Sequence, residues 1–187
     1  AFDPDGPPNS HRAAIERLLT RALVEEDSTG RVVPVAAQRI DVSPDSLLYT
    51  FHLRPGLTFV DGTPCRSSVF RDALRSGLAR ADHSTRRWQL AAVRGVSAIR
   101  IGRPLPALGI ETPDSLTLEL RLAQPDRRLL GRLAMPGTTS AWKSPGAARW
   151  SSAVGLGPLQ LLPADSLRNV VLTRARTALT RADLADT

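Results

Sequence analysis

The stretch LLYTFHLRPGLTFVDGTPCRSSVF, residues 47–70, decides the fold of this 187-residue chain. Its first third alternates in the manner of a strand with one buried face. Leu48, Thr50 and His52 take one side, and the core side carries Leu47, Tyr49, Phe51 and Leu53. Arg-Pro-Gly follows, and Asp61-Gly62 is then typical of a tight turn. A helical pattern over about 67–80 completes the stretch, with an apolar stripe of Phe70, Ala73, Leu74, Gly77 and Leu78.

Strands and helices are interleaved on both sides of this stretch. Residues 37–42 are predicted to pair with 47–53 across the turn Ser-Pro-Asp-Ser. A second alternating arm carries leucine at 116, 118, 120 and 122, and two more strands are expected around a turn at 163–166. Helices are expected from about residue 10 to Leu23, over 84–94, and within DRRLLGRLAMP, ended by Pro136. The order predicts a mixed α and β architecture of the α+β kind, a mixed sheet with hairpins and flanking helices.

Composition is that of a globular chain with an excess of arginine. Hydrophobic residues make up 42%, charged residues 23%, and the net charge is +7, with Lys143 the only lysine. The arginines are spread along the chain beside acids, and aromatic residues are 4%, so we expect no nucleic-acid partner. No apolar run approaches the ~20 residues of a membrane span, and the chain does not open on a signal-peptide pattern.

The sequence offers no recognisable catalytic or metal-binding set. His11, His52 and His83 share no ligand spacing, and Cys65 is alone. The Gly-x-Gly at 155–157 is too short to indicate phosphate binding. We therefore expect neither an enzyme nor a metal or cofactor site. Trp142 and Trp150 fall in a long polar loop, where they could line a ligand surface, whereas a helical Trp88 would ordinarily be core.

The opening stretch resembles a signature of the extracellular solute-binding proteins of family 5, the dipeptide, oligopeptide and nickel-binding class that serves ABC importers. Members read like Tyr-Thr-Phe-x-Leu-Arg-x-Gly-x-x-Phe-x-Asp-Gly-x-Pro, which is matched without a gap from Tyr49 to Pro64. Neighbouring pieces follow in the family's order: IETPDSLTLELRLAQPD, LAMP, GLGPLQL and NVVLTRA. The likeness covers nearly all of the chain.

The resemblance implies a partial lobe of a periplasmic-binding-protein-like type II fold. Family members are two-lobed and longer, so residues 1–187 are expected to be the N-terminal part of the first lobe, with a possible subdomain insertion at about 55–150. The implied role is the non-catalytic solute-binding component of an ABC importer for peptides or similar small solutes, with permease subunits as partners. The implied location is extracytoplasmic, held to the membrane by a lipid anchor that this sequence does not contain.

The resemblance also implies where ligand contacts would lie. These positions are Trp88, Gly137, Thr138, Thr139, Ser140, Trp142 and Leu156. The chain departs from the family in two places. Arg66 and Val69 stand where the family's capping box is found, so Ser67 is expected to cap the helix. Leu156 and Leu159 replace a threonine and an aromatic residue in Gly-Thr-Gly-Pro-Tyr.

Two other functions stay open from the sequence. The same lobe could be the sensor part of a transcription regulator, which a helix-turn-helix segment upstream would decide. An enzyme finds no support beyond ordinary polar residues. Because the grip of a two-lobed receptor depends on both lobes, we expect this chain alone to bind ligand weakly or not at all.

Overall fold

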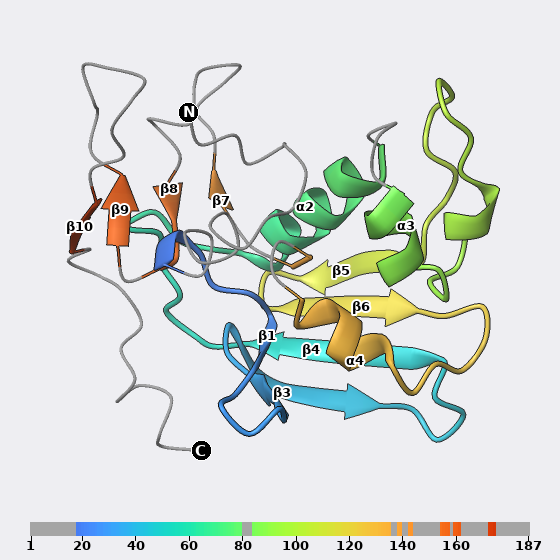
Figure 1. Cartoon of the computed structure of the whole chain (residues 1–187), viewed down its shortest axis with the longest axis horizontal. Coiled ribbons are helices and arrows are strands. Elements are labelled where there is room, and N and C mark those ends of the chain that lie inside the picture. The colour runs from blue at the N-terminus through green and yellow to red at the C-terminus, as the bar shows by residue number, and fades with distance from the viewer. Residues whose placement is uncertain are drawn as a thin grey trace.

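A four-stranded antiparallel sheet organises the chain. The computed structural model describes residues 18–79, 84–135, 138–139, 142–143, 154–157, 159–161 and 172–174. The strands lie in the order β3-β4-β6-β5 (Figure 1). Their bounds are Ala37–Val42 for β3, Leu48–Leu53 for β4, Thr117–Arg121 for β6 and Ile110–Asp114 for β5. The predicted hairpin of residues 37–42 with 47–53 is thereby confirmed.

One face of this sheet forms the core. Along β4 burial alternates as the sequence predicted, and Tyr49, Phe51 and Leu53 are buried. Leu118 and Leu120 of β6 extend the same apolar layer. Helix α2, Ser67–Ala79, packs against β5 and β6 through Phe70, Leu74 and Leu78, each fully buried. The predicted helix over 67–80 is confirmed, because an amphipathic stripe finds an apolar sheet face to cover.

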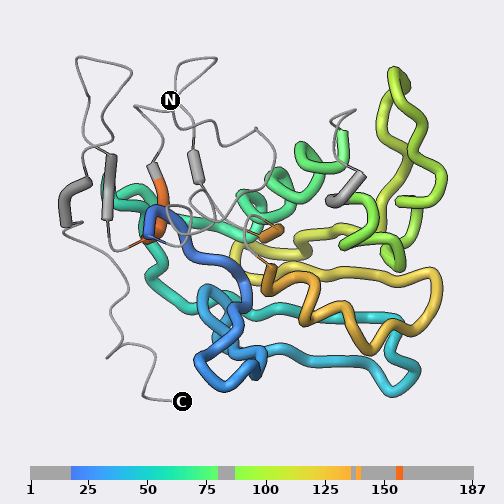
Figure 2. The backbone as a smooth tube through the Cα atoms, viewed as in Figure 1, coloured from blue at the N-terminus to red at the C-terminus, as the bar shows by residue number. Residues whose placement is uncertain are grey.

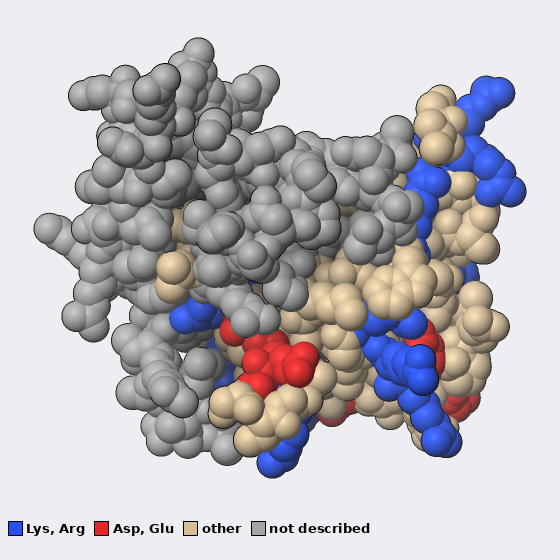
Figure 3. Space-filling view, viewed as in Figure 1, with Lys and Arg blue, Asp and Glu red and all other residues tan. Residues whose placement is uncertain are grey.

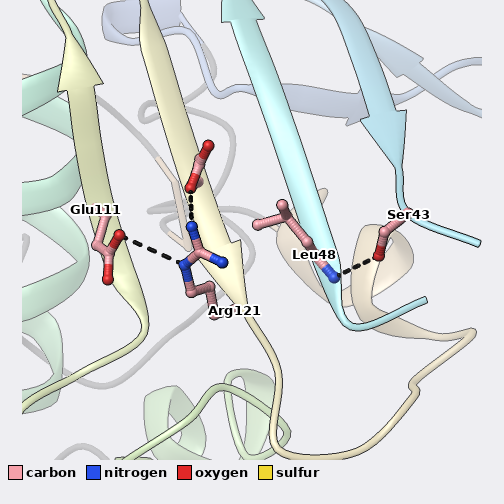
Figure 4. A network of polar contacts seen from close by, with 5 residues as sticks. Ser43, Leu48, Glu111 and Arg121 are labelled. Atoms are coloured by element: carbon pink, nitrogen blue, oxygen red, sulfur yellow. Dashed lines mark hydrogen bonds and ion pairs between the residues drawn. The ribbon is translucent and has the colours of Figure 1, made fainter. Parts of the chain in front are cut away.

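The opposite face of the sheet is polar and laced with ion pairs. Arg121 of β6 lies between Glu119 Oε2 at 2.7 Å and Glu111 Oε2 at 3.4 Å (Figure 4). On β3 and β4, Asp41 Oδ2 lies 2.9 Å from both Arg39 Nη2 and His52 Nε2. A solvated face of this kind is usual for an antiparallel sheet, and His52 lies on it as expected.

Shorter elements surround the sheet. The pair β1 and β2 spans Val24–Glu26 and Val32–Pro34, and β7 (Trp142–Lys143) pairs with β8 (Val154–Gly155). The expected pair near the C-terminus is confirmed as β9 (Leu159–Leu161) with β10 (Leu172–Arg174). Helix α3 covers Ser84–Gln89, a 3₁₀ turn η1 covers Val96–Ala98, and α4 covers Leu129–Leu133, where a short helix was expected.

The expected helix from about residue 10 to Leu23 is wrong at its C-terminal end. Residues 1–17 lie outside the described part. Leu18 and Leu19 are helical, and the helix ends before Thr20. The backbone is then drawn into the core: Leu23 O accepts hydrogen bonds from Val35 N at 3.0 Å and Ala37 N at 3.2 Å. These tertiary hydrogen bonds override the helical spacing, and Glu25 and Glu26 lie in β1 instead of at a helix end.

Three smaller expectations are also corrected. Helix α3 ends at Gln89 instead of about 94, because Val93 bridges to Leu122 beside the sheet. Leu116 is 37% exposed, since it lies in the turn before β6 instead of in the strand. Ser67 is the first residue of α2 and not its cap: its hydroxyl donates to Asp114 O at 2.5 Å, which ties the helix to β5.

Candidate functional site

Two glycines of the segment GLG allow the chain to cross itself closely. A Cβ at Gly155 would collide with Leu19 O, and one at Gly157 would collide with Leu18 O. Gly157 N donates a hydrogen bond to Leu19 O at 2.9 Å, which stabilises this crossing. Val60 N also donates to Gly155 O at 3.1 Å. Figure 2 shows residues 154–157 beside the start of the described chain. The Gly-x-Gly set aside above is therefore a steric requirement that the sequence alone did not reveal.

Thr138 and Thr139 follow α4 and are buried. Thr139 Oγ1 donates to Leu133 O at 3.2 Å and accepts from Leu23 N at 3.2 Å. It thus joins the end of α4 to the segment that leads into β1. Thr138 is 2% exposed, and its hydroxyl has no hydrogen-bond partner among the residues that the structure describes.

Trp88 presents much of its side chain to solvent. It lies on α3 and is 55% exposed, so the ordinary expectation that a helical tryptophan is core is wrong here. The guanidinium carbon of Arg132, on α4, lies 5.7 Å from the ring centroid. Arg132 Nε donates to Gln89 O at 3.0 Å, and the same guanidinium forms an ion pair with Asp126. Arg132 therefore fixes α3 against α4 and covers part of the indole.

The predicted site residues fall into two groups. Thr139 and Leu156 both adjoin the segment between Leu19 and Leu23, and Leu156 is 2% exposed. Trp88 lies apart from them on α3, and α4 connects the two groups. Trp142 is described by its backbone in β7, while Gly137 and Ser140 lie outside the described residues.

Charged groups in the described part hold turns together. The pKa of Asp45 lies below its ordinary value, because its carboxylate accepts a hydrogen bond from the Ser43 hydroxyl and another from Leu47 N. Asp27 and Asp114 have lowered pKa values from hydrogen bonds of the same kind, to Thr29 and to Leu116 N respectively. Carboxylates committed in this way are poor general acids at neutral pH.

The described ranges contain neither a cluster of metal ligands nor a membrane-spanning helix. No three His, Cys, Asp or Glu residues among them lie together in a way that could hold a metal ion, and Cys65 is buried. None of their helices is both long enough and apolar enough to cross a bilayer.

Comparison with known proteins identifies the class that this fold belongs to. Residues 31–175 match the family described as "Bacterial extracellular solute-binding proteins, family 5 Middle". The chain belongs to this family.

Curated relatives agree with this assignment. The chain is 35% identical over 130 residues to di/tripeptide-binding protein 4 of Pseudomonas aeruginosa, covering 66% of this chain and 24% of that protein. It is 30% identical over 146 residues to the periplasmic oligopeptide-binding protein OppA of Escherichia coli, covering 75% and 26%. The chain thus spans about a quarter of the length of these relatives.

Solved structures confirm the predicted fold. OppA of Haemophilus influenzae, in complex with the peptide RPPGFSPFR, superposes with a TM-score of 0.80 at 23% identity, covering 98% of this chain and 37% of that one. The unliganded open form of the murein tripeptide binding protein MppA also gives 0.80, covering 94% and 35%. At this identity the likeness concerns the fold alone.

Proposed function

We propose that this chain is part of the solute-binding component of an ABC importer, taking up peptides or similar small solutes outside the cytoplasm. Membership of residues 31–175 in the solute-binding family carries the proposal. The names of the curated relatives favour peptides as the solute class. The permease partner, the non-catalytic role and a lipid anchor are part of the same proposal.

We also propose that the chain is the N-terminal part of a first lobe, with a subdomain insertion at about residues 55–150. The 130 matched residues make up 24% of di/tripeptide-binding protein 4, so the remainder of such a receptor would supply the facing lobe. Ligand would then be held between two surfaces, of which this chain contributes one.

Among the predicted contact residues, exposure favours Trp88. Its indole is more than half exposed and is held by Arg132, so it is a rigid surface of the kind on which ligand side chains pack. Thr139 and Leu156 are covered by the chain itself, which favours a supporting role for both. Gly137, Thr138, Ser140 and Trp142 stay predictions.

The test is binding by the product of the complete reading frame that encodes these residues. The purified protein is unfolded and refolded to remove bound solute. It is then titrated calorimetrically with dipeptides, tripeptides and a nonapeptide, and with deoxycholate as a solute that is not a peptide. We expect a peptide to bind with micromolar or tighter affinity. Binding of deoxycholate alone would make the solute class wrong, and no binding in the whole panel would contradict the receptor role.

A further inference from the structure

One stretch of the chain carries several arginines with no acid between them. Residues 83–110 contain arginine at positions 86, 87, 94, 100 and 103, and the next acid is Glu111. Glu111 is itself paired with Arg121, at 3.4 Å. Within this stretch the positive charge of the arginines is therefore not offset by a neighbouring carboxylate in the sequence.

The fold presents the middle of this segment as a projecting tip. After η1 the chain turns back, with Arg103 N donating to Arg100 O at 3.2 Å and Gly102 at φ +73°. Arg100 and Arg103 are exposed on both sides of Ile101, which is 65% exposed, the highest value among the exposed large hydrophobic residues of the described part. The tip leaves the body of the molecule beyond α3 (Figure 1), and arginine or lysine atoms crowd this projection in Figure 3.

The tip is anchored at its base. Val96, Ile99 and Leu108 are buried in the core, and Gly109 N donates to Arg94 O at 2.9 Å. The Arg100 guanidinium donates from Nη1 to Ser97 O at 3.0 Å, which holds this charge beside the turn. Ile101 is thus exposed on an ordered loop, while the other apolar residues of this loop, Val96, Ile99 and Leu108, are buried in the core.

We propose that this basic tip, defined as Arg100, Ile101 and Arg103, docks on an anionic lipid bilayer surface. Guanidinium groups beside a single protruding aliphatic side chain match the layering of such a surface, with anionic headgroups outside and hydrocarbon beneath. A folded acidic protein would instead need a broad complementary face, and the tip offers three side chains. The affinity is weak by itself, so the tip orients a protein that something else brings to the membrane.

The experiment is vesicle co-sedimentation of the 187-residue chain. Vesicles of phosphatidylcholine alone are compared with vesicles that contain 30% phosphatidylglycerol, at 0.1 M and 0.5 M salt. We expect binding to the anionic vesicles only, weakened at high salt because screening shortens the range of the attraction. Arg100→Gln combined with Arg103→Gln lowers the partition coefficient by roughly 25-fold, about fivefold for each charge. Ile101→Ser lowers it by about tenfold through lost apolar burial.

The matched control is Arg66→Gln combined with Arg127→Gln, which removes the same charge from exposed positions outside the tip. It is expected to change binding by less than threefold. Three outcomes would each overturn the proposal: a loss of binding in the control equal to that of the tip variant, binding to uncharged vesicles, or unchanged binding of Ile101→Ser.

Ile101→Cys labelled with an environment-sensitive dye is a second readout, since Cys65 is buried and shielded from the reagent. A blue shift on anionic vesicles is expected, and an unchanged spectrum contradicts insertion. Solute binding plays no part in these measurements, so this proposal and the receptor role fail separately.

Discussion

Gly155 illustrates how one residue can be fixed by its neighbour's backbone. The carbonyl of Leu19 occupies the space where a side chain would begin. The glycines of GLGPLQL were visible in the sequence as a resemblance to the family, but the backbone of Leu18 and Leu19 that lies against them was not. The signal was present, and its cause lay some 135 residues away along the chain, from Leu19 to Gly155.

Gly155→Ala is therefore expected to lower the free energy of unfolding by roughly 1–3 kcal/mol, the usual cost of overpacking. Urea denaturation followed by circular dichroism measures it. Gly131→Ala is the control: Gly131 lies in α4 with open space where a Cβ would be, so alanine should be neutral or stabilise by up to about 1 kcal/mol. Equal destabilisation by both substitutions would contradict the steric account.

Asp45 gives a prediction on pH. The folded-state pKa is lowered, so the carboxylate stabilises the protein above the ordinary value of 3.8. That contribution is lost as the pH falls from there through the folded-state pKa. The difference in stability between the wild type and Asp45→Asn should therefore shrink on acidification through this range. Ser43→Ala removes the largest cause of the lowered Asp45 pKa, so it should narrow the pH range over which this stability difference is lost. An unchanged pH range would refute the Ser43 hydrogen bond as the origin of the lowered pKa.

At the scale of elements, the contact between α3 and α4 depends on Arg132. Its side chain is 15% exposed and reaches Asp126, Gln89 O and the Trp88 ring at once. The sequence predicted a short helix here and a helix that carries Trp88. Nothing in the spacing indicated that the two would share one guanidinium, because residues 88 and 132 belong to separate periodic patterns.

Arg132→Leu should cost roughly 1.5–3 kcal/mol, because it leaves the largely buried Asp126 carboxylate without its charged partner. Arg128→Leu, one helical turn earlier and exposed, is the matched control and should cost less than about 0.5 kcal/mol. Tryptophan emission of a Trp142→Phe and Trp150→Phe background should shift with Arg132→Leu only. A shift with both variants would mean that the ring responds to charge in general.

Thr139 links α4 to the start of β1. Thr139→Val keeps the shape but leaves Leu23 N without an acceptor inside the core, which should cost about 1–3 kcal/mol. Thr139→Ser keeps the hydroxyl and loses one methyl group, so it should cost about 0.8 kcal/mol. Chemical denaturation of the two variants separates the roles. If valine is tolerated better than serine, packing and not the hydrogen bond matters at this position.

On the scale of the whole molecule, the described residues form one continuous core beneath a sheet whose other face is solvated. Residues from β1 to Leu156 contribute to that core. The relatives that it matches are far longer, so the chain corresponds to one part of a longer family architecture.

The 187-residue chain by itself is therefore expected to bind peptides only in the millimolar range, because a single surface lacks the enclosure that two lobes give. Calorimetry with the peptides that the complete gene product binds is the measurement. Trp88→Ala in that complete product should weaken binding about tenfold. The same measurement on Trp142→Ala shows how much the other predicted tryptophan contributes. Micromolar binding by the chain alone would contradict the prediction.

The sequence by itself determined the sheet's core strands, the helix after them and the family, because local periodicity, turn chemistry and the gapless run from Tyr49 to Pro64 all agree along a single stretch. Only the tertiary structure decided that Leu23 is not helical, that Trp88 is exposed and that position 155 needs glycine. Each depends on a backbone or side chain that is distant in sequence. Such contacts outweigh local propensity, since a buried hydrogen bond or a collision costs more than the preference of one residue for one conformation.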